Sequence, residues 1–193
     1  MKILIATSNQ SKLKEIQNYF ADLSIEFISL KQFPEMPEVI EDADTLKGNA
    51  IKKAVETAEV TGFATISDDT GLEVEALGGR PGVYSARYAG ENVSYEANNK
   101  KLLNNLAGVS NRKAVFKTVM ALVFPHGDIQ MVTGECQGEI LSKFKGNEGF
   151  GYDPIFFVPK LGKTFAEMSI AEKNEISHRG QALKKMKKIL GTM

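Results

Sequence analysis

Four polar clusters in this 193-residue chain contain residue types that bind anions or take part in acid and base chemistry. Each lies at the end of an apolar run or at the start of a helical pattern, where open α/β sheets place their ligands. None of the four is specific when taken alone. The clusters are residues 7–12, residues 68–70, residues 150–153, and the group Lys173, His178 and Arg179.

The first cluster joins a predicted buried strand, residues 2–6, to an amphipathic helical pattern. Free backbone N–H groups at a helix start favour an anion, and Lys12 adds a positive charge. An ordinary turn is the alternative, because Ser, Asn and Gln are common turn residues. Asn9 or Ser11 is expected to cap the helix. The cluster consists of Thr7, Ser8, Asn9, Gln10, Ser11 and Lys12.

The second cluster begins with two acids that follow a predicted strand over residues 63–67, and LEVEAL predicts a further strand. Neighbouring side chains on a strand alternate faces, so at most one of Asp68 and Asp69 is expected to be central to catalysis. Turn capping is the alternative for both. If the ligand is a nucleoside triphosphate, Mg²⁺ is the fitting cation, with Asp69 and Glu41 as its candidate ligands. A solvated acidic face is the alternative for Glu41.

Helical and strand periods alternate along the chain. Helices are predicted to begin at Thr45 and to stop at Gly62, to run over residues 94–106, and to carry SHRGQALKKMKKIL. Two long apolar runs joined at PHGD predict a pair of strands in a hairpin. The mixture predicts an α/β fold with a mixed, partly antiparallel central sheet flanked by helices.

The totals exclude several classes of protein. Twenty-four basic and twenty-four acidic residues cancel, which argues against a nucleic-acid-binding module. The longest apolar run is far shorter than the ~20 residues needed to cross a bilayer, and the first residues lack a secretory pattern. Cys136 is the only cysteine and is interpreted as a small strand residue. We therefore expect a cytoplasmic protein of one domain, with no membrane partner.

Taken together, the clusters resemble the inosine triphosphate pyrophosphatase family. The matching stretches are TSNQSK, SDDTGLEVEALGGRPGVYSARYAG, GFGYDPIFFVP and EKNEISHRGQAL, and the resemblance extends over nearly the whole chain. It implies a single domain over residues 1–193 with two lobes around a cleft. It also implies Mg²⁺-dependent hydrolysis of ITP, dITP and XTP to the monophosphate and pyrophosphate, usually in a homodimer.

The resemblance also implies roles for individual residues. The phosphate loop falls on residues 7–12, the catalytic acid on Asp69, the helix lysine on Lys53 and the metal-side glutamate on Glu41. Thr70 stands where the family often has Ser, and Gly48 stands where many relatives carry a glutamate. The base-binding positions fall on Phe150, Gly151, Tyr152, Asp153, Lys173, His178 and Arg179.

Selection of the base follows from hydrogen-bond chemistry. Lys173, His178 and Arg179 are donors suited to a 6-oxo group, and donors left unpaired by adenine can reject it by ~10⁴-fold. Phe150 can stack on the purine. Two alternatives stay open: a Maf-type nucleotide pyrophosphatase, which prefers pyrimidine or modified nucleotides, and a nucleotide-binding sensor that does not hydrolyse. Pyrophosphate release in the presence of Mg²⁺ separates the sensor from the enzymes.

Overall fold

The computed structural model describes all residues from 1 to 193, and the chain divides into two compact units. The first unit contains Met1–Asp69, Thr118–Thr133 and Ala182–Met193. The second contains Thr70–Lys117 and Gly134–Gln181. Both units are therefore assembled from segments that lie far apart in the sequence.

The strands form a mixed sheet in the order β2-β1-β3-β5-β6-β7-β8, with β4 beside β3. Strand β1 pairs in parallel with β2 and β3, whereas the β3–β4, β6–β7 and β7–β8 pairs are antiparallel. The predicted mixed, partly antiparallel sheet is thus confirmed. The strands are β1 (Lys2–Ile5), β2 (Glu26–Ser29), β3 (Ala64–Val74), β4 (Pro81–Gly82), β5 (Lys113–Val123), β6 (Ile129–Ile140), β7 (Phe156–Val158) and β8 (Lys163–Thr164).

Local capping signals set the helix ends. Asn9, Thr45 and Ser94 each accept a backbone N–H at the start of a helix, and Gly62 ends the second helix in the left-handed conformation (φ 71°). These ends agree with the predicted ones. The helices are α1 (Gln10–Tyr19), α2 (Leu46–Thr61), α3 (Tyr95–Asn105), α4 (Ile170–Ile176) and α5 (His178–Leu190), with short 3₁₀ turns η1 (Leu30–Gln32), η2 (Glu75–Leu77), η3 (Ser85–Arg87) and η4 (Phe165–Glu167).

Helix α4 was not predicted from the sequence. It has only seven residues, and a capping box starts it: Ser169 accepts the N–H of Glu172, whose carboxylate accepts the N–H of Ser169 in return. Two reciprocal hydrogen bonds stabilise a helix start that has no long apolar face behind it.

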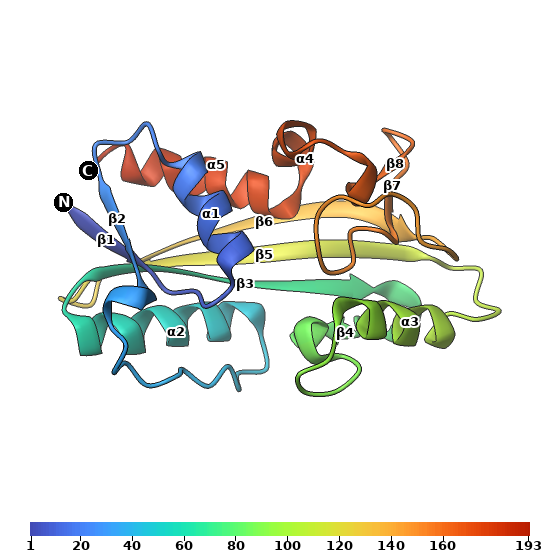
Figure 1. Ribbon diagram of the computed structural model, residues 1–193, viewed down its shortest axis with the longest axis horizontal. Coiled ribbons are helices and arrows are strands. Elements are labelled where there is room, and N and C mark those ends of the chain that lie inside the picture. Colours follow the sequence, from blue (N-terminus) through green and yellow to red (C-terminus); the bar gives the residue numbers. More distant parts are fainter. The chain divides into compact units, whose positions relative to one another are not determined.

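In the first unit, helices α1 and α2 lie on opposite sides of β1 and β3 (Figure 1). Ile3, Ile5 and Ile66 pack with residues of α1, such as Ile16, and with the last part of α5. Leu4 and Ala6 face the other way and pack with Ile28, Phe33 and Phe63. Strand alternation therefore gives both faces of β1 an apolar cover.

The second unit has an aromatic core. Phe116 packs edge-on against Phe156, at 4.8 Å between ring centroids, and stacks on Phe165 at 5.9 Å. Leu72 and Leu102 are fully buried in the same cluster. This core supports the loop that carries the third polar cluster and helices α4 and α5, which carry the fourth.

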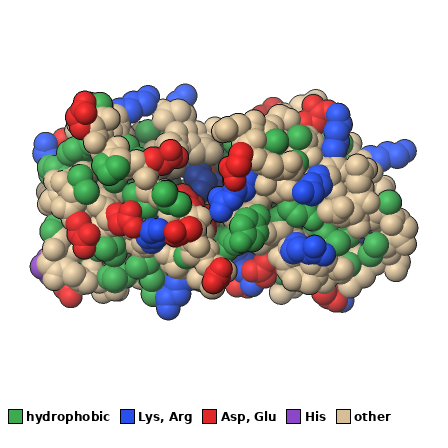
Figure 2. All heavy atoms as spheres, turned by 90° about the horizontal axis from the view of Figure 1, so that it is seen from below, with side chains coloured by type: hydrophobic (Ala, Val, Ile, Leu, Met, Phe, Trp, Pro, Cys, Tyr) green, Lys and Arg blue, Asp and Glu red, His purple; other side chains and the backbone are tan.

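The surface shows no large patch of one charge on the face drawn in Figure 2, where acidic and basic side chains are interspersed. This distribution agrees with the equal numbers of acidic and basic residues. None of the helices has the length and apolar character that a membrane span requires.

Candidate active site

The loop between β1 and α1 is ordered by its own side chains. The Asn9 side-chain oxygen accepts the N–H groups of Ser11 and Lys12, at 3.0 and 3.2 Å, and the Thr7 hydroxyl accepts the N–H of Asn9 at 3.2 Å. Asn9, and not Ser11, is therefore the cap. Because Asn9 already accepts two amides of the helix start, those amides are not available to an anion, and Lys12 is the cation of this loop.

The two adjacent acids do not lie at a strand end, contrary to the sequence prediction. Strand β3 continues without a break over Ala64–Val74, so the predicted strand at residues 63–67 and the one at LEVEAL are a single element. Asp68 and Asp69 lie in its middle and are 1% and 7% exposed. Buried carboxylates need partners on the neighbouring elements.

Those partners come from opposite sides of β3. Asp68 Oδ2 lies 2.8 Å from the ammonium of Lys12 at the start of α1, and Asp69 Oδ2 accepts a hydrogen bond of 3.1 Å from Asn49 on α2. The alternation expected for adjacent strand residues is confirmed. One acid thus binds Lys12 of the predicted phosphate loop, and the other faces the helix that carries Lys53.

Asp69 shares its side of the strand with a second ion pair. Lys53 Nζ lies 2.7 Å from Glu41 Oε1, and the two side chains are 12% and 32% exposed. Burial raises the pKa of Asp69 above its ordinary value, and the charge of Glu41 raises it further. The hydrogen bond from Asn49 and the positive charges of Lys53 and Lys12 act in the opposite direction.

Asp69 and Glu41 fit a divalent cation. Both are carboxylates that bind hard cations, and the charge of Glu41 raises the pKa of Asp69. A cation held by the two groups would offset that repulsion. No group of three or more His, Cys, Asp or Glu side chains forms a complete protein cage. Such a site suits a hard cation that takes its remaining ligands from water and substrate phosphates.

In the second unit, the loop over residues 149–153 folds around Asp153. Its Oδ2 atom accepts the backbone N–H of Phe150 at 2.8 Å and lies 2.6 Å from the Lys173 ammonium. A Cβ at Gly149 (φ +78°) would lie 2.0 Å from that same oxygen. The glycine therefore gives the carboxylate room to turn under the loop.

Phe150 is half-buried and lies beneath two cations. Lys173 Nζ is 5.2 Å and Arg179 Cζ is 5.5 Å from the centroid of its ring, and the ring of Tyr95 is 6.1 Å away. Both cation distances are within the range of cation–π attraction. A flat aromatic surface beside two hydrogen-bond donors matches the needs of purine binding.

His178 and Arg179 begin helix α5, and each is 3% exposed. The His178 ring stacks on Phe116 at 4.4 Å between centroids, so much of it packs in the aromatic core. The Arg179 guanidinium donates to the Thr70 hydroxyl at 3.3 Å. The second unit thus brings together all the predicted base-side residues as well as Thr70.

Gly151 and Tyr152 are fixed to neighbouring elements. The Gly151 carbonyl accepts a hydrogen bond of 2.9 Å from Asn99 on α3, and the Tyr152 hydroxyl donates to the carbonyl of Ser85 at 2.8 Å. Burial, together with the charge of Tyr88, raises the pKa of Tyr152 above its ordinary value. Tyr152 holds the loop in place by this hydrogen bond.

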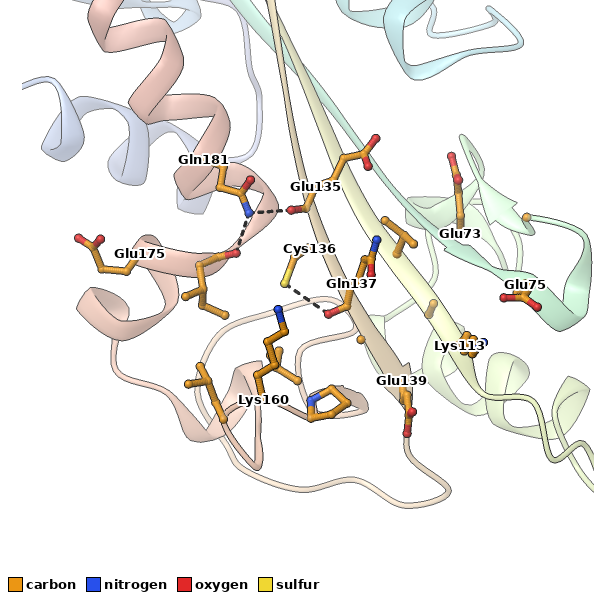
Figure 3. Close-up of a pocket in the computed structure, with 18 residues that line it drawn as sticks. Glu73, Glu75, Lys113, Glu135, Cys136, Gln137, Glu139, Lys160, Glu175 and Gln181 are labelled. Carbon is orange, nitrogen blue, oxygen red and sulfur yellow. Dashed lines mark hydrogen bonds between the residues drawn. The ribbon is translucent and has the colours of Figure 1, made fainter.

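A separate open pocket of about 1120 Å³ lies in the second unit, over β5 and β6 (Figure 3). Its labelled side chains include Glu73, Glu135, Glu139 and Lys113, and none of the residues predicted to do chemistry lines it. Burial raises the pKa of Cys136 in this pocket to about 11. The thiol is therefore a poor nucleophile at neutral pH.

Two contacts of the first unit were not predicted from the sequence. Asn49, which was given no role, contacts Asp69, and Asp68, which was treated as a catalytic or turn-capping candidate, contacts Lys12. The available signal for Asn49 was its spacing from Lys53, since residues four apart share one face of a helix. No local signal pairs Asp68 with Lys12, which lies 56 positions away.

Comparison with known proteins identifies the family. A protein from Desulforamulus reducens named dITP/XTP pyrophosphatase is 49% identical, and the alignment covers 100% of this chain and 97% of that protein. One of the same name from Geobacter sulfurreducens is 48% identical, over 98% of this chain and 96% of its own length. The solved Ham1 protein of Staphylococcus aureus is 42% identical and superposes with a TM-score of 0.92, covering 100% and 99% of the two chains. The model of the Ham1 family matches residues 3–189, and the chain therefore belongs to the Ham1 family.

Proposed function

We propose that this protein hydrolyses non-standard purine nucleoside triphosphates (ITP, dITP and XTP) to the monophosphate and pyrophosphate, and so removes them from the nucleotide pool. The main support is that relatives named dITP/XTP pyrophosphatase are 48–49% identical over nearly the full length of this chain. The acids and lysines around β3 supply the groups that such a reaction needs.

In the proposed reaction, a water oxygen attacks the α-phosphorus and the bond from that phosphorus to the bridging oxygen breaks. The electron pair of this bond leaves with the pyrophosphate. Lys12 and Lys53 stabilise the negative charge that develops on the leaving group. Asp69 orients the attacking water and accepts its proton. The residues of the loop, Thr7, Ser8, Asn9, Gln10 and Ser11, line the phosphate tail.

The proposed cofactor is Mg²⁺, held by Asp69 and Glu41 together with phosphate oxygens and water. When bound, it supplies positive charge that offsets the charge of the triphosphate. This assignment agrees with a site of two carboxylates, because Mg²⁺ usually keeps several waters and takes few protein ligands.

The base is proposed to be recognised by the second unit. Arg179, His178 and Lys173 donate toward the 6-oxo group, and the Phe150 ring stacks on the purine. Gly151, Tyr152 and Asp153 form the loop that presents this ring, and Thr70 places Arg179. The chain over residues 1–193 is further proposed to be a single domain with two lobes.

The enzyme is further proposed to act as a homodimer in the cytoplasm. Sedimentation velocity at micromolar protein concentration tests the first part, and a species with the mass of one chain only would contradict it. Fractionation of the cells that make the protein tests the second.

Pyrophosphate release from a panel of nucleotides tests the reaction. We expect rapid release from dITP, ITP and XTP in Mg²⁺, much slower release from ATP and GTP, and none after chelation of the metal. Preference for a pyrimidine triphosphate would favour the Maf-type alternative. Binding of dITP without any release would favour the sensor and would contradict the proposal.

A further inference from the structure

The Asn49 side chain joins three elements of the first unit. It projects from α2 and is 1% exposed, so its amide needs partners within the protein. Its Nδ2 atom donates to Asp69 Oδ2 on β3 at 3.1 Å. Its Oδ1 atom accepts the N–H of Ala43, in the loop before α2, at 2.9 Å.

The chemistry of the two partners fixes the orientation of this amide. A backbone N–H only donates, so the oxygen of Asn49 has to face Ala43. The NH₂ group then has to face Asp69, whose carboxylate accepts. The reverse orientation would lose both hydrogen bonds, and the Asn49 amide is therefore a defined donor that restrains rotation of the Asp69 carboxylate.

The loop held through Ala43 also carries Glu41. Lys53 lies one turn after Asn49 on the same face of α2 and binds Glu41 at 2.7 Å. The helix therefore holds the loop at Glu41 as well as at Ala43, and Lys52 adds a contact to Asp42 at 2.5 Å. Gly48 permits this close approach, because a Cβ there would lie 2.7 Å from the Cβ of Ala43. The positions of Asp69 and Glu41 are thus linked through neighbouring turns of one helix.

We propose that Asn49 is a positioning residue that sets the spacing of Asp69 and Glu41, and thereby the affinity of this pair for a divalent cation. The inference rests on the metal site of the proposed function and deepens it. Groups that orient metal ligands without touching the metal contribute about 10- to 100-fold to metal affinity in other proteins. Without Asn49, the Asp69 carboxylate loses its amide donor, and the loop loses its attachment at Ala43 while those of Glu41 to Lys53 and of Asp42 to Lys52 remain.

Asn98 provides a matched control within the same chain. It is 2% exposed on α3, its Nδ2 donates to the carbonyl of Ala86 at 2.9 Å, and its Oδ1 accepts the N–H of Ala89 at 2.7 Å. Asn98 therefore fastens a loop to a helix as Asn49 does, but without contacting an acid. Its removal reports the effect of losing such an attachment alone.

The test measures binding of Mn²⁺ alone to the metal-free full-length protein by electron paramagnetic resonance. We expect Asn49→Ala to raise the Kd for Mn²⁺ by at least about 10-fold and Asn98→Ala to leave it unchanged. Asn49→Ser is measured beside them, since serine is too short to reach both partners and covers the case in which the alanine variant does not fold. An unchanged Kd in a folded Asn49 variant overturns the proposal.

A double-mutant cycle with Glu41→Gln separates positioning from a general loss of structure. If Asn49 acts through the spacing of the two acids, Asn49→Ala should cost much less Mn²⁺ affinity when Glu41 has already been replaced. Fully additive effects would contradict the positioning role. The proposed function fails separately: it is lost if the parent binds Mn²⁺ but releases no pyrophosphate from dITP.

Discussion

The Asp153 carboxylate lies 2.6 Å from the Lys173 ammonium, and the two side chains are only 4% and 13% exposed. The same Asp153 oxygen accepts the N–H of Phe150. The Asp153 carboxylate therefore fixes the position of Lys173, proposed to bind the base, and of Phe150, proposed to stack on the purine. The contacts of Asp153 thus set the conformation of the loop over residues 149–153.

Replacing Asp153 should test how much the fold depends on this pair. Asp153→Asn leaves Lys173 largely buried without its counter-charge, which typically costs about 3 to 5 kcal/mol of stability. The measurement is the free energy of unfolding in urea. Lys100→Gln, which breaks an exposed pair with Glu96, serves as the control and should cost less than about 1 kcal/mol. Equal decreases in the free energy of unfolding of the two variants would show that the buried Asp153–Lys173 pair stabilises the fold no more than the exposed pair does.

Gly149 should tolerate substitution less well than another glycine in the left-handed region. Gly78 (φ +63°) has open space around the Cβ position, so Gly78→Ala should cost about 1 to 2 kcal/mol. Gly149→Ala adds a collision with the Asp153 carboxylate and should cost more. Thermal unfolding compares the two. Similar decreases in unfolding temperature for the two variants would show that the loop over residues 149–153 accommodates the added Cβ.

Asp69→Asn should remove turnover while the protein stays folded. Loss of a group that orients and deprotonates water lowers kcat by about 10² to 10⁴-fold. The initial rate of pyrophosphate release from dITP measures the effect, and circular dichroism checks the fold. A folded variant with near-normal kcat would show that Asp69 does not have this role.

The same substitution should stabilise the metal-free protein at neutral pH. The pKa of Asp69 is raised mainly by burial, so folding favours the protonated form and ionisation costs stability. The stability that protonated Asp69 contributes is fully present below the unfolded-state pKa, near 3.8. It is lost as the pH rises through the higher pKa of the folded protein. Urea unfolding with EDTA should therefore show Asp69→Asn to be more stable than the parent at pH 7. The difference should shrink toward pH 4, whereas a constant difference would contradict the assignment.

Arg179→Ala should weaken the choice between ITP and ATP. The guanidinium lies beside Phe150 and is held by Thr70, so its loss removes a donor for the 6-oxo group. We expect the ratio of kcat/KM for ITP over ATP to fall by about tenfold or more. Arg80→Ala, at an exposed arginine of the same unit, is the control and should keep the parent ratio. An unchanged ratio in Arg179→Ala would exclude this account of selectivity.

Features that depend on neighbouring residues could be predicted from the sequence. Asn9, Thr45 and Ser94 cap their helices by hydrogen bonds to the next few residues, and the pattern around each contains that information. The hairpin between β5 and β6 closes at PHGD as expected, with the N–H of Phe124 donating to Asp128 at 2.9 Å.

Features that depend on distant residues could not be predicted in the same way. The stretch DDTG resembles a turn because of its Asp and Gly residues, yet it lies within β3, where pairing with neighbouring strands outweighs local preference. The partners of Asp68 and Asp69 come from α1 and α2. Only the three-dimensional packing decides which lysine or amide reaches each acid.

The opposed directions of Asp68 and Asp69 also restrict how this chain can change in length. Adding or deleting one residue between Ala64 and Asp68 would turn each acid toward the helix that now holds the other. Homologous proteins that keep both partnerships are therefore expected to carry this segment at constant length. Insertions should instead accumulate at surface turns such as residues 125–128, where an extra residue reverses no side chain of the site.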